Sequence, residues 1–395
     1  MTARTADAVI IGAGVTGVSV AFQLAGLGLR RVVVLEKKFV GAGGTGRSVG
    51  IIRQLYPTRE TSEMVLRSLR VFERFGETVG GEANFVRSGV LIGVSPAMRP
   101  TLEKTLAQQR AIGIRAEILE PADLPRIEPH IDPAGLGAVL WEPDSGYGDP
   151  AAVTAGYAAA ARARGVAIEQ GVEVVAIRQA AGRVIGVDTA GGGRIDAPVV
   201  LDAAGLWAPL VARLAGLELP IMVGRHPVFI VERDAAFGAP HTVYLDLAGG
   251  SYVRPETGGL TLTGSLTDDE TQHPMDPDLL GSEAGFDEAA EVLARTARAL
   301  PALADARFSH GYAGAFDITP DWMPILDETP LRGFYVAAGM SGHGFKLAPA
   351  VGEMVAALVT GSRSPVSLAP FRLSRFDGGA AAGTFVSSYL GAESQ

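Results

Sequence analysis

AVIIGAGVTGVSVAFQLAGLGLRRVVVLE, residues 8–36, decides the fold of this chain. We expect an apolar strand over residues 9–11, followed by Gly12, Gly14 and Gly17 and then by a helix. Gly12 allows a tight turn out of the strand, Gly14 allows backbone N–H groups to approach a pyrophosphate, and Gly17 allows the helix to pack close to the sheet. This order of strand, glycines and helix is typical of a Rossmann unit that binds the ADP part of a dinucleotide.

The rest of the same stretch adds to this prediction. The helix begins at Val15 and Thr16, and its unpaired N–H groups and dipole favour two negative phosphates. A second apolar run over residues 31–35 ends at Glu36, whose carboxylate is suited to accept hydrogen bonds from both ribose hydroxyls. Because an acid there disfavours a 2′-phosphate, NADP is not expected. Lys37, the next residue, is expected at the same nucleotide site.

Length and composition narrow the class of protein. A chain of 395 residues is expected to form two domains, because single cores stop growing beyond roughly 250–300 residues. Apolar residues make up 47% and charged residues 19%, as in a compact enzyme. The net charge of −9 argues against nucleic acid or an anionic membrane surface as a partner, because both need a basic face.

The cysteine and histidine content excludes several chemistries. The sequence has no cysteine, so disulfides, thiolate catalysis and flavin attachment through cysteine are impossible. Six histidines are scattered from His130 onward without metal-binding spacing, so no metal site is expected. No secretory signal is visible, and no apolar run reaches about 18 residues. We therefore expect no membrane span and a cytoplasmic location.

The remaining pattern predicts further elements and a change of sheet type. Alternating strands after His226 are typical of an antiparallel sheet, and thus of a second domain. Residues 41–50 form a glycine-dense loop, and residues 377–395 are expected to be a loosely held tail. Helices are predicted over 61–75, 150–164 (capped by Asp149), 287–300 and 348–359, and strands over 85–94, 199–201, 227–231, 242–245, 251–254, 260–263 and 334–338.

Four motifs carry a resemblance to a known family. They are IIRQLY at 51–56, DITPDWMPIL at 317–326, AAGMSGHGFKLAPAVGE at 337–353 and LAPFRLSRF at 368–376. With the Rossmann start, the chain resembles the D-amino acid oxidase superfamily of FAD-dependent oxidoreductases. Within it, the chain is most similar to sarcosine oxidases, monomeric or β subunit, and to dimethylglycine dehydrogenase-like proteins.

The resemblance implies an α/β fold with a Rossmann-like FAD-binding domain and an antiparallel-sheet substrate domain. The FAD-binding domain is expected to be discontinuous, comprising residues 1–85, 146–220 and 312–395. The substrate-binding domain is expected to comprise residues 86–145 and 221–311.

The cofactor implied by the resemblance is FAD. The turn 342–346 at the start of a helix offers N–H groups and a dipole that stabilise negative charge on a reduced flavin. The residues expected to bind the cofactor are Gly12, Gly14, Val15, Thr16, Gly17, Glu36, Lys37, Gly44, Thr45, Arg47, Ser48, Val174, Ala204, Gly205, Trp207, Gly339, Gly342, His343, Gly344, Phe345 and Lys346.

The resemblance also implies a substrate site. Arg53 and Lys346 match positions that bind the substrate carboxylate, and charge-assisted hydrogen bonds from two cations suit that task. Tyr252 and Phe316 match aromatic positions beside the substrate amine, where aromatic faces hold a cationic or methylated nitrogen. His343 is expected to act either as a base or as a support for the loop or flavin edge.

Other residues bear less directly on the site. His226 and His310 are expected to be structural. The lysine associated with oxygen reaction aligns with Thr261, so rapid use of oxygen is not expected. The cysteine that holds FAD covalently aligns near Gly314, and no histidine precedes His130. FAD is therefore expected to be bound non-covalently.

Three functions remain open from the sequence. The favoured one is transfer of a hydride from the carbon next to nitrogen in a small N-substituted amino acid, with electrons passing to oxygen or another acceptor. The second is oxidation of a secondary alcohol, such as a sugar carbon, with His343 as base. The third is a non-catalytic flavoprotein subunit or electron relay, suggested by the β-subunit-like segment 371–376. A partner subunit is compatible with each.

Overall fold

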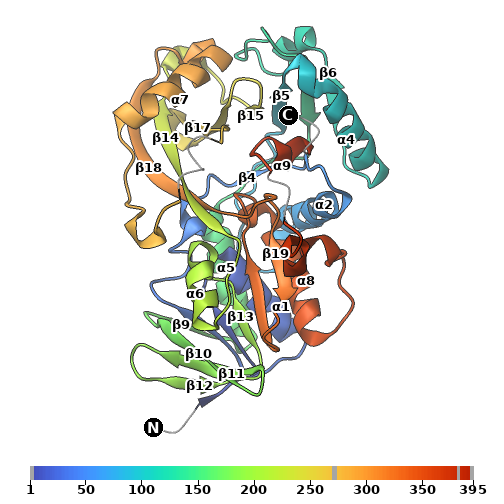
Figure 1. Ribbon diagram of the computed structural model, residues 1–395. Coiled ribbons are helices and arrows are strands. Elements are labelled where there is room, and N and C mark those ends of the chain that lie inside the picture. Colours follow the sequence, from blue (N-terminus) through green and yellow to red (C-terminus); the bar gives the residue numbers. More distant parts are fainter. Residues whose placement is uncertain (1–3, 269–273, 380–382, 392–395) are drawn as a thin grey trace.

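The computed structural model describes residues 4–268, 274–379 and 383–391. Its lower half in Figure 1 contains a six-stranded sheet in which five neighbouring strands run parallel and one edge strand runs antiparallel. The spatial order is β19 (Ile325–Glu328), β20 (Phe334–Ala338), β13 (Val200–Asp202), β2 (Ala8–Ile11), β3 (Val32–Glu36) and β9 (Ala167–Gln170). The stretch 8–36 thus supplies β2 and β3 as predicted, and β2 is buried on both faces because layers cover both sides of the sheet.

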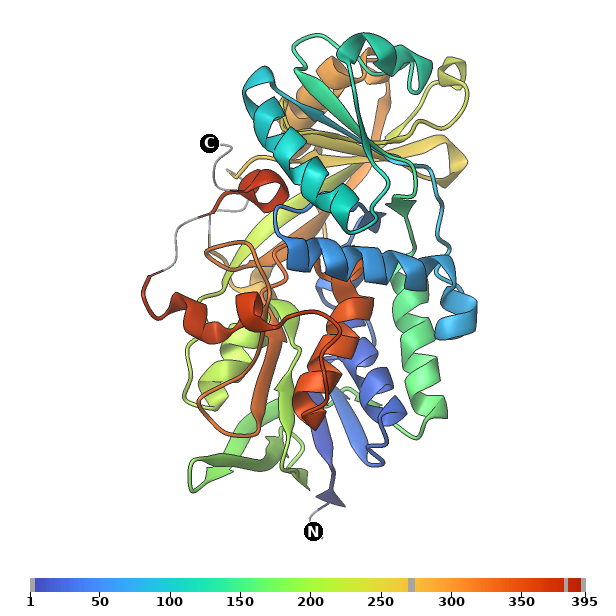
Figure 2. The ribbon, with the colours of Figure 1, turned by 90° about the vertical axis from the view of Figure 1, so that its right-hand side faces the viewer.

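Three helices cover one face of this sheet and lie side by side in Figure 2: α1 (Val15–Gly26), α5 (Pro150–Ala163) and α8 (Gly344–Thr360). The helix α2 (Arg59–Glu73) packs across α8. Asp149 caps α5 as predicted, since its Oδ1 accepts hydrogen bonds from the N–H groups of Ala151 (2.8 Å) and Ala152 (3.0 Å). The helix α8 begins at Gly344, earlier than predicted. Pro349 therefore lies in its second turn and not in its first.

A second layer covers the other face of the parallel sheet. It consists of a four-stranded sheet and the helix α6 (Ala208–Leu214), which share a buried apolar cluster with β2 and β3. The strands of this sheet, in spatial order, are β1 (Arg4–Thr5), β12 (Arg194–Asp196), β11 (Arg183–Thr189) and β10 (Val174–Ala180).

The upper half of Figure 1 is built around an eight-stranded sheet. Its order is β18 (Arg307–Ile318), β14 (Met222–Glu232), β17 (Leu260–Ser265), β16 (Ser251–Pro255), β15 (Val243–Asp246), β5 (Val90–Val94), β7 (Ala138–Glu142) and β6 (Glu117–Leu119). The strands predicted after His226 pair antiparallel as expected, and the earlier strand β5 joins them by pairing parallel with β15. The helix α7 (Phe286–Ala299) packs on this sheet, and its Thr296 hydroxyl lies 2.6 Å from the hydroxyl of Thr263.

One short strand pair and three helices complete the elements named here. They are the strand pair β4 (Ile51–Ile52) and β8 (Gly146–Tyr147), and the helices α3 (Phe75–Thr78), α4 (Arg99–Ala111) and α9 (Ser387–Leu390). The strand predicted over 85–94 begins only at Val90, because Gly89 has a left-handed conformation with φ of 71°. The division into two domains stays a prediction, and its boundary at residue 312 falls inside β18, which continues to Ile318.

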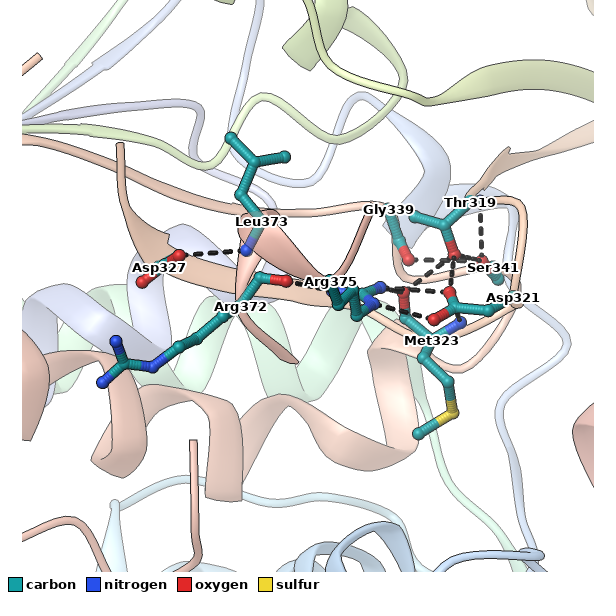
Figure 3. A network of polar contacts seen from close by, with 9 residues as sticks. All are labelled: Thr319, Asp321, Met323, Asp327, Gly339, Ser341, Arg372, Leu373 and Arg375. Carbon is teal, nitrogen blue, oxygen red and sulfur yellow. Dashed lines mark hydrogen bonds and ion pairs between the residues drawn. The ribbon is translucent and has the colours of Figure 1, made fainter. Parts of the chain in front are cut away.

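The C-terminal part is held to the body by a polar network shown in Figure 3. Arg375 donates to both carboxylate oxygens of Asp321 (2.7 and 3.0 Å) and to the carbonyl of Met323 (2.7 Å), and the N–H of Leu373 donates to Asp327 (2.9 Å). This network joins two of the sequence motifs, 317–326 and 368–376.

The prediction of a loosely held tail is wrong for residues 383–391. Phe385, Tyr389 and Leu390 are buried, with at most 5% of each exposed. Their burial follows from the large apolar area that two aromatic rings and a leucine remove from water. Residues 380–382 and 392–395 of the predicted tail lie outside the described part of the chain.

Candidate active site

A cavity of about 470 Å³ runs from the carboxyl ends of the parallel strands to the eight-stranded sheet. Arg53, Tyr252 and Phe316 line it, as predicted for the substrate site. The expected cofactor residues that also line it are Gly12, Gly14, Val15, Thr16, Glu36, Lys37, Gly44, Thr45, Arg47, Ser48, Val174, Ala204, Gly205, Trp207, Gly342, Gly344, Phe345 and Lys346. Three of the residues expected to bind the cofactor do not line this cavity: Gly17, Gly339 and His343.

The glycines of the first turn allow close packing of the backbone at this end of the cavity. Gly12 has φ of 104°, and a β-carbon there would lie 2.5 Å from the carbonyl oxygen of Ala203 in the neighbouring loop. Gly17 faces inward instead, and a β-carbon on it would overlap the carbonyl oxygen of Gly12. The N–H of Val15 donates to the hydroxyl of Thr45 (3.1 Å), which fixes the glycine-dense loop at the start of α1.

Glu36 stands at the carboxyl end of β3 as predicted. Its carboxylate accepts hydrogen bonds from the N–H groups of Ala13 (2.9 Å) and Lys38 (2.8 Å) and still lines the cavity. A carboxylate has about four lone-pair sites, so it retains capacity for a ribose hydroxyl. Its role toward the ribose stays a prediction.

An ion pair between the two halves lies beside the nucleotide end. The Lys37 ammonium is 2.9 Å from the Asp278 carboxylate and lies 4.2 Å above the Trp207 ring. The Trp207 N–H also donates to Asp278 (2.9 Å), and these two hydrogen bonds lower the pKa of Asp278. Sequence reasoning missed Asp278, because nothing in its local pattern indicates proximity to Glu36 and Trp207.

Arg47 and Ser48 have internal partners although they line the cavity. The Arg47 guanidinium donates to the carbonyl oxygens of Gly281 (2.8 Å) and Ala313 (2.6 Å). The Ser48 hydroxyl accepts from the N–H of Gly50 (3.2 Å). Arg47 therefore joins the glycine-dense loop to the eight-stranded sheet.

Arg53 follows β4 and has only 1% of its surface exposed. Its guanidinium carbon lies 3.6 Å from the ring centroid of Tyr389 and 4.4 Å from that of Tyr56. It donates to the carbonyl of Leu55, and its Nη2 lies 3.4 Å from Nδ1 of His343. Two aromatic rings thus contact the guanidinium while it faces the cavity.

Lys346 lies in the first turn of α8 and faces the same cavity. Its ammonium donates to the carbonyl of Gly342 (3.2 Å). Burial and the nearby charge of Arg53 lower the pKa of Lys346 well below its usual value. His343 precedes the helix and lies behind the cavity wall: burial and the charges of Lys346 and Arg53 lower its pKa, and its buried Nε2 has no hydrogen-bond partner among the described residues.

An aromatic wall faces the cavity from the eight-stranded sheet. The ring of His226 stacks on Phe316 with centroids 4.3 Å apart, and its Nε2 lies 3.4 Å from the hydroxyl of Tyr252. Burial lowers the pKa of His226 to about 4, so the imidazole is neutral at neutral pH. His226 lines the cavity with Tyr252 and Phe316, and its expected structural role stays a prediction. His310 is exposed and remote from this wall.

The C-terminal segment adds two residues that sequence reasoning missed. Phe385 stacks against Phe316 with centroids 6.2 Å apart and contacts Trp322 edge-on at 5.2 Å. Tyr389 covers Arg53, and both Phe385 and Tyr389 line the cavity.

Two buried carboxyls lie at the carboxyl ends of the strands, where Asp317 lines the cavity and Asp202 does not. Asp317 accepts from the N–H groups of Gly339 (2.8 Å) and Met340 (3.1 Å), yet burial raises its pKa to about 6. These hydrogen bonds hold Gly339 to β18, and thus explain its position outside the cavity. Asp202 accepts from the N–H of Ala204 (3.1 Å), and burial raises its pKa to about 8, with a further contribution from the charge of Asp317.

Gly314 and Thr261, the two positions at which the sequence departs from the family pattern, have different surroundings. Gly314 lines the cavity, and a β-carbon there would lie 2.5 Å from the carbonyl oxygen of His226. Thr261 does not line the cavity, and its hydroxyl lies 2.8 Å from Nε2 of His241 and accepts from Arg233 (3.0 Å). The expectation that Thr261 occupies the oxygen-reactive position is therefore wrong.

Comparison with known proteins agrees with this geometry. A family model described as FAD dependent oxidoreductase (DAO) matches residues 7–358. The sarcosine oxidase subunit beta of Rhizobium meliloti (strain 1021) is 33% identical over 383 residues, which cover 94% of this chain and 89% of that protein. The mitochondrial sarcosine dehydrogenase of Homo sapiens is 28% identical over 391 residues, covering 94% of this chain and 41% of that protein.

Solved structures give the same result. The crystal structure of L-proline dehydrogenase from P. horikoshii has a TM-score of 0.87 at 27% identity and covers 96% of this chain and 100% of its own. Glycine oxidase from Geobacillus kaustophilus has a TM-score of 0.81 at 26% identity, with coverage of 94% and 99%. The fold and site therefore define a flavoprotein oxidoreductase. The chain belongs to the DAO family of FAD-dependent oxidoreductases, and the predicted fold class is confirmed.

The residues present fit FAD, the cofactor of this family. Gly12 and Gly14 line the cavity without side chains, Glu36 ends β3, and the start of α8 lines the same cavity. Within the described residues, no group of three His, Asp or Glu side chains is placed to hold a metal ion. No helix in residues 4–268, 274–379 and 383–391 is both long and apolar enough to cross a membrane.

Proposed function

We propose that this chain oxidises a small N-substituted amino acid at the carbon next to its nitrogen. The observation that supports this most is a pair of buried cations, Arg53 and Lys346, which are 1% and 7% exposed and face one cavity. In the described part of the chain neither forms an ion pair with a carboxylate. A buried charge is costly unless it is paired, so the pair favours an anionic ligand. A substrate carboxylate supplies that anion.

The aromatic wall suits the substrate nitrogen. Tyr252 and Phe316 offer ring faces that attract a cationic or methylated nitrogen and exclude water. His226 is neutral between them, so it does not repel an ammonium group, and its Nε2 side with the Tyr252 hydroxyl can accept a hydrogen bond from it. Once the substrate nitrogen has released this proton to water, its lone pair lets a hydride depart from the carbon next to the nitrogen, and water hydrolyses the resulting iminium.

FAD, when bound, supplies the two-electron acceptor for this hydride. The part of the chain that stabilises the developing negative charge is the turn at Gly342 and Gly344, where backbone N–H groups and the dipole of α8 converge. Phe345 closes that end of the cavity with an apolar ring. These residues orient the flavin and stabilise its negative charge, while Arg53 and Lys346 bind the substrate carboxylate.

The relatives support an amino-acid substrate. Their names include sarcosine, dimethylglycine and 4-methylaminobutanoate, and the structural neighbours include enzymes of proline and glycine. Use of oxygen, use of another acceptor and association with a partner subunit remain parts of this proposal. The similarity to proteins named as β subunits supports the partner.

The alcohol hypothesis has less support. It needs His343 as base, but His343 does not line the cavity and its Nδ1 lies toward Arg53. The relatives named above act on amines and not on alcohols. The hypothesis of a non-catalytic subunit rested on the segment 371–376, and that segment packs within this chain through Arg375 and Asp321.

The test is flavin reduction without oxygen. The purified yellow protein is mixed with N-methylglycine, with a methylated amine lacking the carboxylate, and with glycosides, and the flavin absorbance is followed. We expect bleaching by N-methylglycine alone. Bleaching by glycosides alone would establish the alcohol hypothesis, and no bleaching by any donor would favour the non-catalytic subunit.

A variant pair checks the carboxylate role. Arg53→Ala should weaken reduction by an acidic substrate far more than by a neutral analogue. Arg59→Ala is the matched control, because Arg59 is exposed and pairs with Glu63 on the surface of α2. Equal losses for the acidic and the neutral substrate in Arg53→Ala would contradict the proposal.

A further inference from the structure

The segment 383–391 reaches the substrate end of the cavity from a firmly anchored base. The network in Figure 3 fixes residues 372–375 to the loop after β18 through Arg375 and Asp321. Beyond residue 382 the chain is attached again: the N–H of Phe385 donates to Asp268 (2.6 Å), and its ring contacts Trp322 edge-on. Figures 1 and 2 show α9 between the two halves of the molecule.

Tyr389 fixes the plane of the Arg53 guanidinium. Its ring centroid is 3.6 Å from the guanidinium carbon, while the Tyr56 centroid is at 4.4 Å. Because rings contact the flat guanidinium, an incoming carboxylate has to meet its N–H edge, which is the geometry of strong charge-assisted hydrogen bonding. Arg53 already donates to the carbonyl of Leu55, and this bond restrains rotation within the plane.

Phe385 closes the cavity beside this cation. Its ring is stacked near Phe316 (6.2 Å, with planes 17° apart) and tilted against Tyr389 (5.4 Å). One side chain thus connects the aromatic wall at the substrate nitrogen with the ring that covers Arg53. When the aromatic wall holds the substrate nitrogen and Arg53 holds its carboxylate, Phe385 limits the length of the side chain that the substrate can carry.

We propose that the C-terminal segment 383–391 completes the substrate site, with Tyr389 positioning Arg53 for the carboxylate and Phe385 restricting the substrate to short amino acids. This inference rests on the proposed function, since it names the groups that select the substrate class at that site. Neither residue takes part in the hydride transfer itself.

The first test measures carboxylate binding without turnover. The flavin spectrum is titrated with acetate and with neutral acetamide in the wild type, Tyr389→Ala, Tyr389→Phe and Val386→Ala. We expect acetate to bind about tenfold more weakly to Tyr389→Ala, which loses a desolvated cation–π contact. The loss should be smaller in Tyr389→Phe, which keeps the ring and loses only the hydrogen bond between the Tyr389 hydroxyl and Arg53. Val386→Ala is the control from the same segment, because Val386 does not line the cavity.

The second test measures selectivity. Phe385→Ala should raise the kcat/KM for an N-methyl amino acid with a long side chain relative to N-methylglycine by about tenfold or more. Flavin content and thermal midpoint are compared among the variants, and truncation after residue 379 should combine both effects.

The outcomes separate this inference from the proposed function. If the wild type is not reduced by any amino acid, the proposed function fails. If the wild type is reduced but Tyr389→Ala binds acetate as tightly as the wild type, or Tyr389→Phe as weakly as Tyr389→Ala, the positioning role of the ring is wrong. An unchanged selectivity in Phe385→Ala would overturn the restriction of substrate length.

Discussion

Gly17 packs so closely on Gly12 that a β-carbon on Gly17 would overlap the carbonyl oxygen of Gly12. The contact brings the first turn of α1 directly against the turn that follows β2. The position of the N–H groups at the start of α1, and thus of the nucleotide end of the cavity, depends on this contact.

Gly17→Ala should therefore lower both stability and FAD content. Overpacking of this kind costs about 1–3 kcal/mol, and here it displaces the turn that holds the nucleotide. The control is Gly191→Ala, because a β-carbon on Gly191 would meet nothing within 4 Å. Thermal melting and the ratio of flavin to protein absorbance measure the two effects. Full flavin content in Gly17→Ala would show that the turn tolerates the extra carbon.

Lys346 predicts a pH dependence of carboxylate binding. Burial and Arg53 lower its pKa, so the free enzyme loses this positive charge at a lower pH than an ordinary lysine does. The affinity for acetate should fall as the pH rises through that lowered pKa. In Lys346→Arg the charge persists at every pH in the titration, so this fall in affinity should vanish. An identical alkaline fall in both proteins would assign the titration to another group.

The nucleotide end of the site was predictable because its determinants are local. Residues 8–36 contain the strand, the glycines and Glu36, so that spacing alone fixes their relation. The substrate end depends on chain segments far apart in the sequence. Arg53 came from the resemblance, but its partner Tyr389 lies near the other end of the chain, and the glycine- and alanine-rich tail gave no indication of that contact.

The alternation of side chains along a strand could have shown on which face of the sheet His226 and Thr261 lie. In β14, His226 and Val228 lie two residues apart and both line the cavity, so the period of a strand places His226 on the cavity face. In β17, Thr263 contacts α7 while Leu262 packs with Val228, so Thr261 lies on the face turned away from the cavity. The position of Asp278 could not be predicted in this way, because it lies in a turn, where side chains do not alternate regularly between two faces.

Asp202 should make the folded protein less stable as the pH rises. Its pKa is about 8 in the folded state, whereas an ordinary aspartate, as in the unfolded chain, has a pKa of 3.8, so between these values the folded state binds more protons. The free energy of unfolding therefore falls from about pH 4 to about pH 8 and then levels off. Asp202→Asn stays neutral and should be more stable than the wild type at pH 8 by on the order of a few kcal/mol.

Urea unfolding at several pH values measures this difference. Asp305→Asn is the control, because Asp305 is exposed. If Asp202→Asn and the wild type have the same pH dependence, the carboxyl at position 202 titrates normally in the folded protein.

Thr261→Lys tests which face of β17 meets the flavin. The Thr261 side chain is fully buried against His241 and Arg233, so a lysine there would lose two hydrogen bonds and place a second cation beside Arg233. We expect the free energy of unfolding to fall by about 2 kcal/mol or more, and the rate at which oxygen reoxidises the reduced flavin to stay unchanged. Stopped-flow absorbance measures that rate, with Thr257→Lys, an exposed position in the same hairpin, as the control. A much faster reoxidation in Thr261→Lys with normal flavin content would place this side chain beside the flavin, and the strand register derived for β17 would then be wrong.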